Sequence, residues 1–223
     1  MKKILLALAA LVMTAGAVPA VMQSTEPVAV AQTKTKTDRF PAHPDQPSDV
    51  KVVVTGGHGS AVHIGNGYFL TACHVVATTK AAPKVKLHDG SVREAETLWC
   101  NPAYDIALLR APAEGVAVSA LQCSLPAVGD TITLTGNPLI LENITSFARV
   151  AGAERSLSKW KSVFIVDGAV VPGQSGGAAF NDKREVVGIT VGVVMWPLGL
   201  SATTTGYGTI VPGKTICGLL ARA

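Results

Sequence analysis

Charged residues are scarce in this sequence. Only 15% of its 223 residues are Asp, Glu, Lys or Arg, whereas 48% are hydrophobic, and this balance excludes a disordered, highly charged protein. No stretch outside the N-terminal leader is rich in Lys or Arg, so nucleic acid is not an expected partner. No Cys-x-x-Cys pair occurs among the four cysteines, so the sequence supports neither a zinc site nor a redox motif. We expect no metal and no cofactor.

Long apolar runs are also missing, except at the N-terminus. Two lysines precede a hydrophobic segment from Ile4 to Val18, and small-residue cleavage sites follow, as in a signal peptide. Residues 1–20 are therefore predicted to be removed, with cleavage after Ala20 or as late as Ala31. An uncleaved leader that tethers the domain to a membrane is the alternative. Both interpretations predict an exported domain, periplasmic or secreted, with no stable membrane association beyond the leader.

The rest of the chain indicates short strands. Residues 21–48 have little apolar periodicity and are interpreted as a flexible spacer. The 22 glycines and 13 prolines favour many short strands over long helices. Gly65-Asn66-Gly67 and Asp89-Gly90 predict two tight hairpins, and only Lys214 to Arg222 looks helical. Strands are expected at 51–54, 61–64, 68–71, 85–88, 91–93, 105–110, 131–135, 163–167, 185–196 and 206–211. Their spacing predicts an all-β sandwich or barrels.

Three short motifs bear residues suited to acyl transfer. His74 follows an apolar strand, Asp105 opens another, and Ser175 lies in Pro-Gly-Gln-Ser-Gly-Gly. A lone His beside a strand or a lone acid at a strand start is more often structural than functional, and the glycine-serine motif alone is about equally often either. They occur, however, in the order His, Asp, Ser, at separations of 31 (105 − 74) and 70 (175 − 105) residues, which makes coincidence an unlikely explanation.

The chemistry needs each of these residue types. A serine hydroxyl becomes a useful nucleophile when an imidazole takes its proton, and a buried carboxylate fixes the tautomer of that imidazole. The N–H groups of Gly173 and Ser175 are expected to converge on a tetrahedral oxyanion. One such donor contributes about 3 kcal/mol of transition-state stabilisation. We therefore predict a catalytic triad of His74, Asp105 and Ser175.

With these motifs the sequence resembles the trypsin-like serine peptidases, and among them the protease domain of the bacterial Deg/HtrA-type enzymes. The similarity runs from about Gly59 to Leu220 and includes Gly136-Asn137-Pro138 and the stretch from Gly206 to Pro212. The resemblance implies a chymotrypsin-like fold of two antiparallel six-stranded β-barrels with a short C-terminal helix. The protease domain is then expected at 49–223, with barrel 1 at about 49–122 and barrel 2 at about 123–213.

Several features depart from the family pattern. Within the 223 residues there is no room for PDZ domains, so peptide sensing by such domains is not expected. Val191 stands where many relatives place a Ser or Thr that supports the triad Asp. Because the chain is predicted to be exported, its four cysteines are permitted to form disulfides. Cys100 with Cys123 is the pairing we favour, although some cysteines could instead be small buried apolar residues.

The resemblance also implies a specificity pocket. The residue six positions before the nucleophile, Ala169, would form its floor, and Val191, Gly192 and Val193 would bind substrate along its wall. An uncharged floor cannot neutralise a buried Lys or Arg, so small or medium apolar side chains are expected before the scissile bond. The predicted function is an exported serine endopeptidase acting on proteins or peptides. The alternatives are an inactive protease fold used as a binding module and a secreted lectin-like domain. The sequence indicates no oligomeric state.

Overall fold

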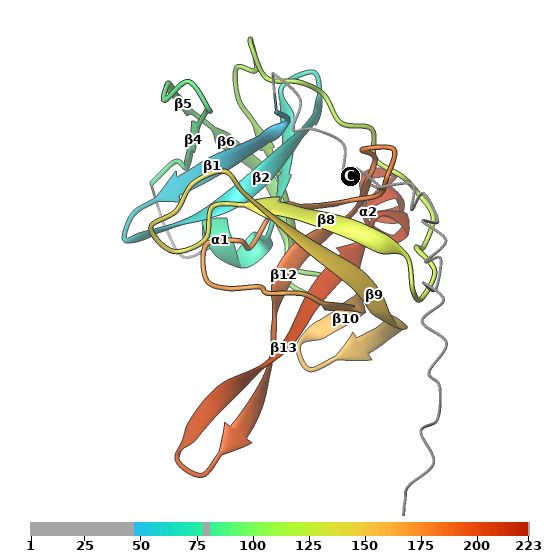
Figure 1. Ribbon diagram of the computed structural model, residues 1–223. Coiled ribbons are helices and arrows are strands. Elements are labelled where there is room, and N and C mark those ends of the chain that lie inside the picture. Colours follow the sequence, from blue (N-terminus) through green and yellow to red (C-terminus); the bar gives the residue numbers. More distant parts are fainter. Residues whose placement is uncertain (1–46, 78–80, 223) are drawn as a thin grey trace, which may run out of the picture. The chain divides into compact units, whose positions relative to one another are not determined.

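The computed structural model describes residues 47–77 and 81–222. They form two antiparallel sheets, one from residues 49–110 and one from residues 131–212 (Figure 1). The predicted leader and all but the last two residues of the predicted spacer lie outside the described residues. Among the described residues, no helix has the length and hydropathy needed to cross a membrane.

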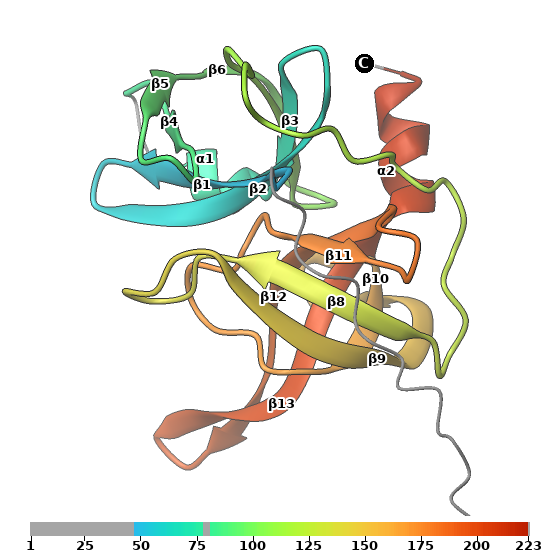
Figure 2. The ribbon, with the colours of Figure 1, turned by 45° about the horizontal axis from the view of Figure 1, so that its top comes forward.

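The first sheet has seven strands in the order β5-β4-β1-β2-β3-β7-β6. Their bounds are β1 (Asp49–Val54), β2 (Gly57–Gly65), β3 (Tyr68–Thr71), β4 (Lys84–Lys86), β5 (Val92–Glu94), β6 (Glu96–Asn101) and β7 (Ile106–Arg110). The two end strands, β5 and β6, are separated only by Ala95, whose N–H donates to the carbonyl of Pro83 at 2.9 Å. Residues 92–101 therefore form one nearly continuous, bent segment that supplies the end strand on each side of the sheet. This explains why seven strands are found where six were expected, and why the sheet wraps into a barrel-like half (Figure 2).

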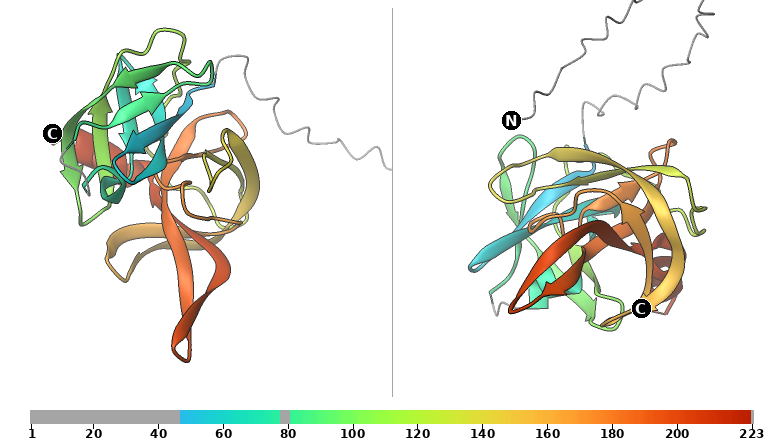
Figure 3. Two further views of the ribbon diagram at one scale, coloured as in Figure 1. Left: turned by 90° about the vertical axis from the view of Figure 1, so that its left-hand side faces the viewer. Right: turned by 60° about the horizontal axis from the view of Figure 1, so that its bottom comes forward.

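The second sheet is a closed six-stranded barrel, as predicted, in the order β10-β13-β12-β11-β8-β9. Its strands are β8 (Thr131–Gly136), β9 (Ile144–Leu157), β10 (Trp160–Asp167), β11 (Ala178–Phe180), β12 (Val186–Leu198) and β13 (Ser201–Pro212). The hairpin of β12 and β13 extends well beyond the barrel (Figure 3). It exposes Met195, Trp196, Leu198 and Leu200.

Two helices complete the domain. Helix α1 (Cys73–Ala77) follows β3 and buries Val75 and Val76. Helix α2 (Gly213–Leu220) corresponds to the predicted C-terminal helix and buries Ile216 and Leu219. The predicted all-β fold with a short C-terminal helix is thus confirmed.

One hydrophobic core joins the two halves. It contains Phe69 and Leu70 of the first sheet together with Val163 and Ile189 of the second, all four completely buried. A smaller cluster fills the interior of the second barrel around Phe164 and Ile210. The two sheets are therefore packed as one unit, and the loop that carries Ser175 bonds to Ser60 of the first sheet.

The cysteines form two disulfides, Cys73–Cys100 and Cys123–Cys217, with Cα–Cα distances of 5.2 and 5.7 Å. The predicted pairing of Cys100 with Cys123 is wrong. Cys100 lies in β6, which packs against α1, and Cys73 is the first residue of that helix. Cys123 instead follows Gln122, whose carbonyl lies against Gly213 at the start of α2, the helix that carries Cys217.

Candidate active site

His74 is the second residue of α1 and lies beside Asp105. Its Nδ1 is 2.8 Å from Oδ2 of Asp105, and its backbone N–H donates to Oδ1 of the same carboxylate, also at 2.8 Å. An ionised carboxylate can only accept hydrogen bonds, so Nδ1 is the donor, and in the neutral imidazole Nε2 then carries the lone pair. The imidazole is 39% exposed and lines a cleft, where Nε2 can act as a base.

Asp105 ends a turn just before β7 and adopts φ +59°, a left-handed conformation in which Asp is enriched. Its carbonyl accepts the N–H of Cys73 at 3.1 Å, which holds the start of α1 against it. The carboxylate is 4% exposed. Burial acts to raise the pKa of Asp105, but hydrogen bonds from His74 and from Nε1 of Trp160, at 3.1 Å, outweigh it and hold that pKa below its usual value.

Ser175 lies in the loop between β10 and β11 and lines the same cleft as His74. Its carbonyl accepts the backbone N–H of Ser60, in β2, at 2.8 Å. Gly59 precedes Ser60 in β2. A Cβ on Gly59 would lie 2.9 Å from the carbonyl oxygen of Ser175 and 2.6 Å from a methyl of Val75. The first sheet therefore lies close to the loop between β10 and β11 and holds the backbone of Ser175 in place.

Two glycines of this loop have no substitute. Gly173 adopts φ +96° and Gly176 φ +87°, in the region that L side chains rarely adopt. A Cβ on Gly173 would clash with the carbonyl of Asn137, and one on Gly176 would clash with the carbonyl of Ser60. Both the conformation and the close backbone packing of the loop therefore require glycine.

A network of buried polar groups holds the backbone of the loop that carries Gly173 and Ser175. The hydroxyl of Ser60 donates to the carbonyl of Gly173 at 2.8 Å and accepts the N–H of Asn137 at 2.9 Å. The side chain of Asn137 also donates to Val50 and accepts the N–H of Asn143. His58 Nε2 lies 2.9 Å from the carbonyl of Asn137, and a carbonyl can only accept, so Nε2 is protonated. These residues connect β1, β2 and the segment after β8 to the loop that carries Gly173.

The cleft has a volume of about 500 Å³. Of the predicted substrate-binding residues, Val191, Gly192 and Val193 line it. Ala169 does not line it: this residue is exposed, whereas its neighbour Val170 is 5% exposed and is part of the cleft wall. The cleft wall at this point is formed by Val170, and the assignment of Ala169 as the pocket floor stays a prediction.

Trp160 is the residue of this site that sequence reasoning missed. It is the first residue of β10, it lines the cleft, and its indole N–H reaches Asp105 across 55 residues of sequence. No motif surrounds it. The only signal was indirect, namely the apolar Val191 at the position where a hydroxyl was expected.

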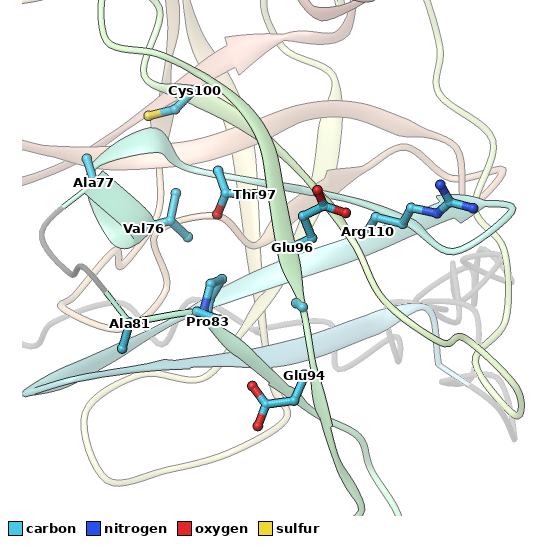
Figure 4. Close-up of a pocket in the computed structure, with 11 residues that line it drawn as sticks. Val76, Ala77, Ala81, Pro83, Glu94, Glu96, Thr97, Cys100 and Arg110 are labelled. Atoms are coloured by element: carbon cyan, nitrogen blue, oxygen red, sulfur yellow. The ribbon is translucent and has the colours of Figure 1, made fainter.

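A second hollow, of about 610 Å³, shares no lining residue with the cleft. It lies against α1 and is lined in part by Glu94, Glu96 and Arg110 (Figure 4). Across residues 47–77 and 81–222, no group of three or more His, Cys, Asp or Glu side chains is arranged to hold a metal ion.

Comparison with known proteins identifies related sequences. The trypsin-like peptidase domain family matches residues 59–189. The putative serine protease HhoB of Synechocystis sp. is 31% identical over 167 residues, which cover 71% of this chain and 38% of HhoB. The periplasmic serine endoprotease DegP of Salmonella typhimurium is 28% identical over 171 residues, which cover 74% of this chain and 35% of DegP. The chain thus spans little more than a third of the length of these relatives.

Solved structures share the fold. The Rv3671c protease in its inactive form is 20% identical with a TM-score of 0.67, and the match covers 79% of this chain and 89% of that one. The HtrA-type protease AlgW with a tripeptide is 24% identical with a TM-score of 0.68, and the match covers 78% of this chain and 59% of that one. At these identities the likeness concerns the two-barrel architecture alone.

Proposed function

We propose that this chain, which belongs to the trypsin-like peptidase domain family, is an exported serine endopeptidase with His74, Asp105 and Ser175 as its triad. The observation that carries the proposal is that His74, joined to the buried carboxylate of Asp105 at 2.8 Å, lines one cleft with Ser175. Relatives with periplasmic or serine protease names support both the activity and the export.

The proposed reaction begins when Nε2 of His74 takes the proton of the Ser175 hydroxyl as Oγ attacks the carbonyl carbon of a peptide. The negative charge develops on the carbonyl oxygen, which accepts hydrogen bonds from the N–H groups of Gly173 and Ser175. The imidazolium, stabilised by the Asp105 carboxylate, then gives its proton to the leaving amine, and an acyl-enzyme ester remains. A water molecule attacks this ester with His74 again as base, and the peptide acid is released.

The cleft favours an apolar side chain before the scissile bond. Val170, Val171, Val191 and Val193 line it, and no carboxylate lines it within the part of the chain that the structure describes. A Lys or Arg side chain would enter without a partner, which costs several kcal/mol. Peptides with Ala, Val or Leu at this position are therefore the expected substrates. Each methylene buried there contributes about 0.8 kcal/mol.

Labelling with a fluorophosphonate probe tests the proposal. The wild-type protein should be labelled at Ser175 and should hydrolyse an unfolded protein such as casein, because only an activated serine reacts. Ser175→Ala should abolish both labelling and hydrolysis, while Ser91→Ala, which removes an exposed hydroxyl from a turn, should change neither.

Failure of the wild-type protein to react with the probe, with its fold intact, would contradict the proposal. It would favour a protease fold used as a binding module.

A further inference from the structure

One oxygen of the Asp105 carboxylate is shared between two donors. Oδ2 lies 2.8 Å from Nδ1 of His74 and accepts the indole N–H of Trp160 at 3.1 Å. Oδ1 accepts the backbone N–H of His74. Val191, at the position where a supporting hydroxyl was expected, has a buried apolar side chain that can donate nothing. Among the described residues, the donors to this carboxylate are therefore two groups of His74 and the indole N–H of Trp160.

The backbone conformation around Trp160 orients its indole ring toward the first sheet. The turn between β9 and β10 contains Ser158 at φ +52°, and the pairing of the two strands shifts register directly after Trp160. The next residue, Lys161, donates its N–H to the carbonyl of Ala103 at 3.0 Å. This bond fixes the first residues of β10 against the turn that precedes Asp105.

The ring itself is held on both sides. A Cβ on Gly192 would lie 2.7 Å from the edge of the six-membered ring of Trp160, so only glycine leaves room for the indole there. Nζ of Lys159 lies 5.2 Å from the ring centroid, within the range of a cation–π contact. Trp160 is 9% exposed. The N–H therefore has a fixed direction toward Asp105.

We infer that Trp160 is the positioning residue of the triad: its indole N–H fixes the rotation of the Asp105 carboxylate and thereby the orientation and tautomer of His74. The inference rests on the proposed function. A neutral N–H that donates to a buried carboxylate stabilises its ionised form, which must persist while the imidazolium forms. His74 is the titratable group in contact with this carboxylate, and Lys159 lies over the indole.

Trp160→Phe tests this role, since it removes the N–H and keeps an aromatic ring beside Gly192. We expect kcat to fall about tenfold, equivalent to about 1.4 kcal/mol, with KM changed less than twofold. The acidic limb of the kcat/KM profile should move to higher pH, because loss of the donor makes protonation of the histidine–aspartate pair easier. Replacement by benzothienylalanine, which keeps the shape and lacks the N–H, should reproduce both effects.

The chain provides a matched control. Trp99, in β6, has a buried indole N–H without a hydrogen-bond partner among the described residues. Trp99→Phe removes the same atoms without removing a hydrogen bond, so kcat and the pH profile should stay at wild-type values.

A second measurement does not depend on activity. In the Ser175→Ala background, the pKa of Asp105, followed by carbon NMR of its carboxyl, should rise when Trp160 is replaced and stay unchanged when Trp99 is replaced. An unchanged pKa of Asp105 would overturn the inference, as would equal kcat values for Trp160→Phe and Trp99→Phe. Loss of the proposed peptidase function would instead appear in the wild-type protein, as absence of labelling and hydrolysis, and the NMR result would still decide the role of Trp160.

Discussion

Removal of the Ser60 hydroxyl is expected to damage both stability and catalysis. All three hydrogen-bonding positions of this buried hydroxyl are used. It donates to the carbonyl of Gly173 at 2.8 Å and accepts from the backbone and side-chain amides of Asn137 at 2.9 and 3.2 Å. Ser60 and Asn137 are fully buried, so water does not replace the lost partner in the folded protein.

The magnitude follows from the groups that Ser60→Ala leaves unpaired. The backbone N–H of Asn137 and the carbonyl of Gly173 lose the bonds described above, whereas the side chain of Asn137 keeps its bond to Val50. Each buried polar group without a partner costs about 1–3 kcal/mol, so the loss of two partners should lower the free energy of unfolding by about 2–6 kcal/mol. Because the carbonyl of Gly173 loses its anchor, the oxyanion donors should also be displaced, and kcat should fall by about tenfold or more.

Urea denaturation and steady-state kinetics on an apolar peptide measure the two effects. Ser156→Ala is the control, since this exposed hydroxyl also donates to a carbonyl, that of Lys161 at 2.8 Å, and its loss should cost less than about 0.5 kcal/mol. The reasoning would be refuted if Ser60→Ala unfolded at the same urea concentration as Ser156→Ala.

Two further predictions concern charge. Glu142 forms ion pairs with Lys51 and Lys86 of the first sheet, both at 2.8 Å, and these hydrogen bonds lower its pKa from 4.5 to about 2. A lowered pKa in the folded state gives stability that is present above pH 4.5 and is lost as the pH falls toward 2. Glu142→Gln should therefore unfold more easily than wild type at pH 6, by about 1 kcal/mol for a partly exposed pair, and match it near pH 2 in urea titrations. Ala169→Asp should shift cleavage toward Lys or Arg before the scissile bond in a peptide library if Ala169 is the pocket floor, and a shift with Val170→Asp alone would instead place Val170, which lines the cleft, at that floor.

The local features of this protein could be predicted from its sequence. The hairpin at Gly65-Asn66-Gly67 and the helix near Lys214 depend on short-range preferences of the chain. The three motifs were predicted as a group because each has its own local pattern, and the structure brings His74 and Asp105 into contact and places Ser175 in the same cleft.

Features that depend on contacts between distant residues could not be predicted. Strand β9 was missed because the residues that point inward along it, Ala148, Val150 and Gly152, are small and give a weak alternating pattern. The disulfide partner of Cys100 depends on how α1 packs against β6, and the place of Val170 in the cleft wall depends on the path of one loop. An indole N–H that reaches a carboxylate from another sheet leaves no periodicity in the sequence.

The site exists only where the two halves meet. His74 and Asp105 belong to the first half, and the loop of Ser175 belongs to the second. Hydrogen bonds cross between them at the site, and among these are Ser60 N–H to the carbonyl of Ser175, the Ser60 hydroxyl to the carbonyl of Gly173, Lys161 N–H to the carbonyl of Ala103, and Trp160 Nε1–H to Asp105. The first two bonds hold the backbone of Ser175 and Gly173, and the last two hold the segments around the carboxylate of Asp105. In each of these hydrogen bonds the donor belongs to one half and the acceptor to the other. A change that loosens the packing of the two sheets should therefore reduce activity before it unfolds either half.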